Sequence, residues 1–129
     1  MSLFNALGIA ASVLSAQSTR MNTTASNLAN ADSVSAPGTQ PYKSKQVVFE
    51  AKADGKVKVS MIVGSAAPAK MVYDPSHPMA NQDGYVTQSN VNPIEEMINM
   101  MSAARSYQTN VEVLNTTKNM LVKTLEIGK

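Results

Sequence analysis

The chain has 129 residues, a formal net charge of +2 and no cysteine. This length allows one domain, and so small a charge gives no support for a nucleic-acid or membrane-surface partner. The absence of thiols excludes disulfide scaffolds, thiol nucleophiles and cysteine-ligated metals. Leu, Ile, Val and Phe supply only 27 residues and tryptophan is absent, whereas nine methionines can pack adaptably against imprecise partners. We therefore expect no large compact core.

Residues 1–30 are predicted to form a long helix, starting at Ser2 and ending near Leu28. Every seventh residue is apolar, which indicates a seam for another helix: Leu7, Leu14, Met21 and Leu28. Arg20 is the one charged side chain in the sequence between Met1 and Ala31. Two interpretations fit this composition and can hold at different stages: a marginal helix that frays alone, or a helix packed on several sides in an assembly, where buried charge would be costly. The stretch lacks the positive start of a secretory signal peptide, so we expect no cleavage.

The middle of the chain is predicted to be a linker at 31–44 followed by a small β module at 45–91. Asn, Asp, Ser, Pro and Gly follow in quick succession in the linker. Val47–Val63 has the alternation of a hairpin around the turn Asp54-Gly55. Two shorter strands are expected at Met71–Tyr73 and Tyr85–Thr87.

One histidine is the strongest candidate for acid–base chemistry. His77 has Asp74 and Asp83 nearby in sequence, and a carboxylate–histidine pair can transfer protons. Pro75 and Pro78 bracket the histidine, however, and Asp-Pro commonly opens a turn. We therefore expect a structural turn, no enzyme activity, no metal and no cofactor.

Residues 92–129 are predicted to form a second and longer helix. Asn92 can cap the first amides, Pro93 fits the first helical position and Glu95 fits a capping box. No Pro or Gly follows until Gly128, so the helix would be about 50 Å long. A heptad seam places Met97, Ala104, Val111, Lys118 and Leu125 at position a, and Met100, Tyr107, Leu114 and Leu121 at position d. Such a seam is too long to bury inside so small a domain, so it requires partners.

The fold class expected from these elements is α+β, with the β module inserted between two long terminal helices. The helices would pack as an antiparallel coiled coil, and neighbouring subunits would bury what remains. The helix pair would form an inner tubular layer with the β module outside it. The candidate packing and assembly residues are Leu7, Leu14, Met21, Leu28, Met97, Met100, Tyr107, Val111, Leu114, Leu121 and Leu125.

Several motifs resemble the axial rod proteins of the bacterial flagellum, and the short proximal members in particular. Two motifs are similar to signatures that rod and hook proteins share: Ala25-Ser26-Asn27-Leu28-Ala29-Asn30-Ala31, and Ser106-Tyr107-Gln108-Thr109-Asn110 with Leu114-Asn115. More diagnostic are Val72-Tyr73-Asp74-Pro75-Ser76-His77-Pro78, Gly84-Tyr85-Val86 and Asn90-Val91-Asn92. The resemblance spans essentially the whole chain. It departs where Thr39-Gln40-Pro41 separates Pro37-Gly38 from Tyr42, since the commoner version runs directly from Pro-Gly into Tyr.

The resemblance implies a structural subunit that self-assembles into the proximal rod, which transmits torque and encloses the secretion channel. It also implies export through the flagellar type III apparatus without a cleaved signal, followed by assembly in the periplasm. The implied partners are other rod subunits and the adapter that joins the rod to the inner-membrane ring, with no nucleic acid and no small-molecule substrate. The alternative is a small secreted or periplasmic binding module whose helices serve only to oligomerise it.

Overall fold

The computed structural model describes residues 2–128, which form two helices and five strands. Helix α1 is Leu3–Ala29 and helix α2 is Pro93–Ile127. The strands are β1 Val34–Ser35, β2 Lys45–Ala51, β3 Val57–Gly64, β4 Lys70–Tyr73 and β5 Tyr85–Gln88. Two helices with small antiparallel sheets confirm the predicted α+β class. Neither described helix has the length and apolar character needed to cross a bilayer.

Polar side chains cap the start of each helix. The Ser2 hydroxyl oxygen accepts a hydrogen bond from the Asn5 amide at 3.1 Å. Asn92 Oδ1 accepts from the amides of Ile94 and Glu95 at 3.1 and 3.5 Å, and Pro93 occupies the first helical position. Helix α2 therefore begins where the capping pattern predicted, and Ser2 caps α1 in the same way.

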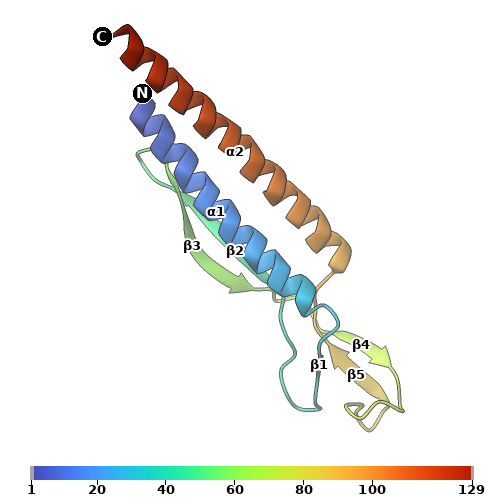
Figure 1. The fold of residues 1–129 in the computed structure, drawn as a ribbon. Coiled ribbons are helices and arrows are strands. Elements are labelled where there is room, and N and C mark those ends of the chain that lie inside the picture. The colour runs from blue at the N-terminus through green and yellow to red at the C-terminus, as the bar shows by residue number, and fades with distance from the viewer. Residues whose placement is uncertain (1, 129) are drawn as a thin grey trace.

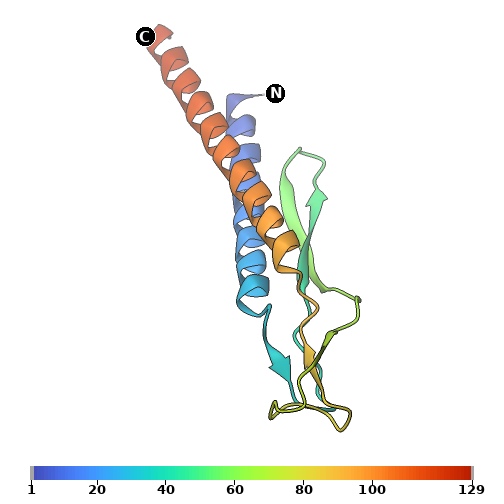
Figure 2. The ribbon, with the colours of Figure 1, turned by 90° about the vertical axis from the view of Figure 1, so that its right-hand side faces the viewer.

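Helix α1 lies between the other helix and a hairpin. Figure 1 shows α2 along one side of α1 and the strands β2 and β3 along the other, and Figure 2 shows the same arrangement from the side. A helix covered on two sides has little room for charged groups, because burying them is costly. This position explains why Arg20 is the one charged side chain of α1.

The hairpin of β2 and β3 confirms the predicted strand pair and its turn. The strands are antiparallel, and Gly55 in the turn has φ of +84°, which favours glycine. The Asp54 carboxylate accepts from the Lys56 amide at 3.1 Å and stabilises the turn. The register shifts by one residue between Val48 and Phe49, so a bulge interrupts the alternation.

The other strands form a separate sheet in the order β1-β5-β4, which lies beyond the helix ends in Figure 1. The short strands predicted at 71–73 and 85–87 are confirmed as β4 and β5. Strand β1 lies inside the segment predicted to be a linker, and pairs Val34 and Ser35 with Gln88 and Thr87. The middle of the chain is thus two sheets, and the linker contributes to one of them.

The core is small and consists of small side chains. The buried apolar residues among the described ones are Ala10, Ala16, Val86, Val91 and Ala103. The largest side chains that are fully buried are polar, namely those of Asn27, Thr24 and Ser89. The expectation that the chain lacks a large core is confirmed.

Candidate assembly surfaces

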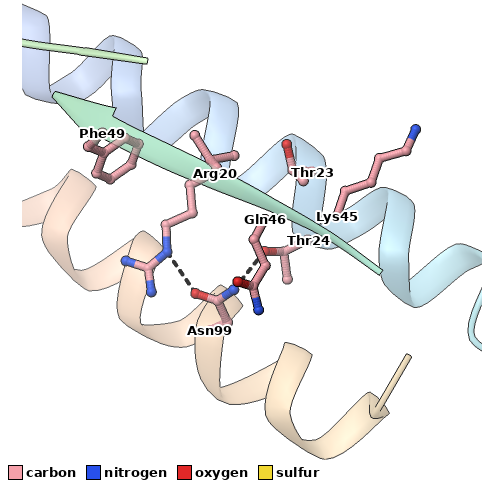
Figure 3. A pocket seen from close by; sticks show the side chains of 8 residues that line it. Arg20, Thr23, Thr24, Lys45, Gln46, Phe49 and Asn99 are labelled. Atoms are coloured by element: carbon pink, nitrogen blue, oxygen red, sulfur yellow. Dashed lines mark hydrogen bonds between the residues drawn. The ribbon is translucent and has the colours of Figure 1, made fainter. Parts of the chain in front are cut away.

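A polar contact joins the two helices near the start of α2. Arg20 Nε donates a hydrogen bond to Asn99 Oδ1 at 2.7 Å, and Asn99 Nδ2 donates to Thr24 Oγ1 at 3.3 Å. Figure 3 shows both bonds, with Arg20 reaching from α1 to α2. The contact links one residue of α2 to two residues that lie one turn apart on α1, so it sets the relative position of the helices.

These residues lie in a groove of about 390 Å³ between α1, α2 and β2. Its lining consists of Arg20, Thr23, Thr24, Lys45, Gln46, Val47, Phe49 and Asn99. Lys45 points away from the Arg20–Asn99 contact in Figure 3. The lining holds no carboxylate, histidine or cysteine, and residues 2–128 contain no cluster of three or more potential metal ligands. The groove therefore offers hydrogen-bonding and packing groups, with no pair suited to acid–base work.

Nine of the eleven predicted packing residues are half-buried in the single chain. They are Leu7, Leu14, Met21, Leu28, Met100, Tyr107, Val111, Leu114 and Leu121. The other two differ, since Met97 is 58% exposed and Leu125 is 69% exposed. The structure thus leaves these two large apolar side chains in contact with solvent.

The buried positions of α2 differ from the predicted heptad at position a. Glu96, Ala103 and Thr117 are buried, and each precedes a predicted a residue by one. The four residues at the predicted position d are all half-buried. Met97 follows buried Glu96 by one residue and is exposed, whereas Leu125 lies in the stretch 122–128, which is exposed throughout.

A fully buried asparagine attaches the end of α1 to β2. Asn27 Nδ2 donates to the Lys45 carbonyl oxygen at 2.8 Å. Asn27 Oδ1 accepts from the Lys45 amide and from the Tyr42 hydroxyl, both at 2.9 Å. Both polar atoms of this side chain are hydrogen-bonded, and it holds the amide and the carbonyl of one strand residue at once. The sequence analysis named Asn27 only as part of a motif and did not predict that it attaches the hairpin to α1. The one signal in the sequence was a polar residue next to the seam residue Leu28.

A second polar joint lies where α2 begins. Asn90 Oδ1 accepts from the Ser44 amide at 2.6 Å, and Asn90 Nδ2 donates to the Ala67 carbonyl oxygen at 2.9 Å. The Ser44 hydroxyl donates to Glu96 Oε1 at 3.3 Å, while buried Glu96 Oε2 has no hydrogen-bond partner among the described residues. Three loops and the first turn of α2 thus meet at the base of the helix pair.

The candidate acid–base stretch forms a turn. His77 Nδ1 accepts from the Met79 amide at 3.0 Å, and Asp74 Oδ1 accepts from the Ser76 hydroxyl at 2.7 Å. The rings of Tyr73 and Tyr85, on neighbouring strands, stack edge to face with centroids 5.3 Å apart. The hydrogen bonds of His77 and Asp74 are therefore local, as in the turn interpretation.

Apolar side chains remain exposed at both ends of α2. We call Ile94, Met97, Ile98 and Met101 the start patch, and Val122, Leu125 and Ile127 the end patch. Spacings of three, four and seven residues place the start patch on one side of the helix. Apolar surface gathered in this way commonly marks a contact with another protein.

Comparisons with known proteins agree on one family. A family model described as "Flagella basal body rod protein" matches residues 7–35, and "Flagellar basal body rod FlgEFG protein C-terminal" matches residues 82–127. The chain is 54% identical to the flagellar basal-body rod protein FlgC of Salmonella typhimurium and 52% identical to that of Yersinia enterocolitica. It is 40% identical to FlgC of Bacillus subtilis, and each match covers the full length of both chains. The chain therefore belongs to the FlgC family of flagellar basal-body rod proteins, which are structural proteins and not enzymes.

Proposed function

We propose that this chain builds the wall of the proximal rod by packing its two helices against those of neighbouring subunits. The observation that carries the proposal is the apolar surface left exposed on α2. A helix of 35 residues is about 50 Å long, and α1 covers one side of it. The start and end patches remain open to water, so association with other subunits would bury them.

Within each subunit, α1 and α2 would pair as an antiparallel coiled coil. Support comes from the polar contact, in which Arg20 and Thr24 of α1 both reach Asn99 of α2. The two ends of the chain lie at the same end of the helix pair in Figure 1. Half-buried residues at positions d of α2 and at every seventh residue of α1 supply the seam.

The polar and small residues of this seam suit a subunit that is exported before it assembles. Thr24, Ala103 and Thr117 are buried where a tight coiled coil would carry large apolar side chains. A weak helix pair unfolds readily for transport through a narrow channel and regains stability when neighbours cover it. We propose export through the flagellar type III apparatus without a cleaved signal, followed by assembly in the periplasm.

The neighbours in this proposal are further copies of the chain, other rod subunits and the adapter to the inner-membrane ring. The two sheets would lie outside the helical layer and make lateral contacts. Many helices packed side by side would share the torsional load of a rotating rod and enclose the secretion channel. The family assignment favours this structural role over the binding-module alternative.

The test replaces Leu114 and Leu121 together with Asp in a strain that lacks the native gene. Two charges in the seam would prevent helix packing, so we expect incomplete rods and no swimming, while export of the subunit continues. The matched control replaces the exposed residues Asn115 and Asn119 with Asp and should swim normally. Normal swimming of the Leu114→Asp, Leu121→Asp variant would contradict the proposal.

A further inference from the structure

The groove between α1, α2 and β2 carries positive charge without an acidic group. Its two charged lining residues are Arg20 and Lys45, and no lining residue is a carboxylate. Glu96, one turn before Asn99 on α2, does not line the groove and accepts a hydrogen bond from Ser44. The groove volume of about 390 Å³ lies within the range of about 300–1,000 Å³ that is usual for ligand pockets. The groove therefore has the charge and the room for a carboxylate from outside the chain.

The guanidinium of Arg20 keeps free donors after its contact with α2. Its Nε donates to Asn99, and its two terminal nitrogens form no hydrogen bond or ion pair with residues 2–128. The described ends of the chain lie far from this contact, since Ser2 is about 25 Å away along α1 and Gly128 about 40 Å away along α2. A guanidinium can bind a carboxylate through two parallel hydrogen bonds. Arg20 is therefore suited to receive an acidic side chain in the groove.

The edge of β2 that borders the groove has unpaired backbone groups. Among the described residues β2 pairs only with β3, and no residue of β3 lines the groove, so the groove lies at the other edge of β2. The amide and the carbonyl of Lys45 bond to Asn27 and therefore face that edge. Backbone groups that face away from a partner strand alternate along an antiparallel ladder, so the amide and the carbonyl of Val47 face the groove as well. No loop group among residues 2–128 bonds to them, and such an edge can accept a further strand.

We propose that an extended segment of another rod protein pairs with this edge of β2 and places an acidic side chain on Arg20. The inference rests on the proposed function and adds to it the chemistry of one lateral contact. Hydrogen bonds to the backbone of Val47 would hold the segment, and the guanidinium would select a carboxylate at one position. The half-buried side chains of Val47 and Phe49 would contact apolar neighbours of that carboxylate.

The described residues of a second copy offer no such segment. Outside its helices and strands the carboxylates are those of Asp32, Asp54, Asp74 and Asp83. Three of these residues lie in turns, and Asp74 accepts a hydrogen bond from the Ser76 hydroxyl where a turn begins. The one strand carboxylate, that of Glu50, already pairs with Lys58. A free carboxylate in an extended segment therefore has to come from a different protein.

Two proline variants test the backbone pairing. Val47 and Ile62 are opposite each other in the hairpin, and their amides face away from the partner strand toward opposite edges. Proline removes an amide and is tolerated at such edge positions. In a strain that lacks the native gene, Val47→Pro should lower the number of complete basal bodies by at least about tenfold, because the segment loses its donor. Ile62→Pro is the matched control and should assemble normally.

Urea unfolding of the two purified proline variants shows whether the hairpin stays folded. Equal midpoints with a loss of basal bodies only for Val47→Pro would support the pairing. Normal assembly of Val47→Pro would overturn it and leave the helix packing of the proposed function intact. The Leu114→Asp, Leu121→Asp variant tests that function separately. If Val47→Pro unfolds at a lower urea concentration than Ile62→Pro, the charge variant of Arg20 decides.

A charge reversal tests the acidic partner. Arg20→Glu would place two carboxylates together in the groove, so it should lower the number of complete basal bodies by at least about tenfold. Selection for restored swimming should then yield changes that replace an Asp or Glu of another rod protein with Lys or Arg. Normal swimming of Arg20→Glu, or a selection that yields no change outside this chain, would overturn the proposal. Within that second outcome, a changed Asp or Glu of this chain would identify a second copy as the occupant, and a change at Asn99 would show that Arg20 acts only between its own helices.

Discussion

Replacing Asn27 with Ala should detach the hairpin from the end of α1. The substitution removes three hydrogen bonds, to the amide and carbonyl of Lys45 and to the hydroxyl of Tyr42, and of these groups the Tyr42 hydroxyl keeps its contact with the Ser26 hydroxyl. Each intramolecular hydrogen bond contributes about 0.5–1.5 kcal/mol, and groups left unpaired in a buried place cost more. We therefore expect a loss of about 3 kcal/mol in the free energy of unfolding.

Urea unfolding of the purified chain, followed by far-ultraviolet circular dichroism, measures this loss. With a denaturant dependence of about 2 kcal/mol per molar, the midpoint should fall by about 1.5 M. Amide exchange should also accelerate at Lys45, because its amide loses its acceptor. The matched control is Asn22→Ala on the exposed side of the same helix, which should change the stability by less than about 0.5 kcal/mol. A similarly small change for Asn27→Ala would refute the view that this side chain holds the hairpin to α1.

Three further changes test other parts of the fold. Ser44→Ala removes the one hydrogen-bond donor that the Glu96 carboxylate has among the described residues. The free energy of unfolding in urea should fall by about 1–2 kcal/mol. No loss would indicate that the hydrogen bond between Ser44 and Glu96 does not support α2. Gly84→Ala should lower the free energy of unfolding by about 1 kcal/mol more than Gly38→Ala. Both glycines have positive φ, but only at Gly84 would the added Cβ lie 2.9 Å from the Tyr73 ring. Equal losses for the two variants would exclude the steric effect. The hydrogen bond from the Lys56 amide holds the pKa of the Asp54 carboxyl below its usual value of 3.8. The stabilisation of the hairpin by the ionised Asp54 carboxylate is therefore present above pH 3.8 and is lost as the pH falls through the lowered pKa. A carbon-detected NMR titration of Asp54 should show the lowered midpoint. A midpoint at or above 3.8 would contradict the assignment.

The local signals of this sequence were sufficient for the two helices and the β2–β3 hairpin. Ser2 and Asn92 mark the helix starts because their side chains can accept from free amides, and the structure shows those bonds. Asp54-Gly55 marks the hairpin turn because glycine adopts positive φ without steric cost. These features depend on a few neighbouring residues, so periodicity and turn chemistry reveal them.

Strand β1 and the division into two sheets were not predicted. Two residues, Val34 and Ser35, are too few to show an alternating pattern, and their partner β5 lies some fifty residues later in the chain. The same holds for Asn27 and Asn90, whose partners lie 15 to 46 residues away. An asparagine gives no sequence signal for which distant backbone group it will bind.

The sequence alone determined the two long helices, the hairpin, the scarcity of core residues and the resemblance to rod proteins, because each rests on local pattern or motif. Only the tertiary structure decided which side of each helix is covered. It placed α1 between α2 and the hairpin, and buried Glu96, Ala103 and Thr117, each one residue before a predicted position a. The physical reason is that periodicity identifies the residues that share a helix face, whereas the extent to which that face is covered depends on where the distant second helix and the hairpin lie. Met97 and Leu125, which the pattern placed in the seam, are exposed and lie in the patches that we propose for assembly.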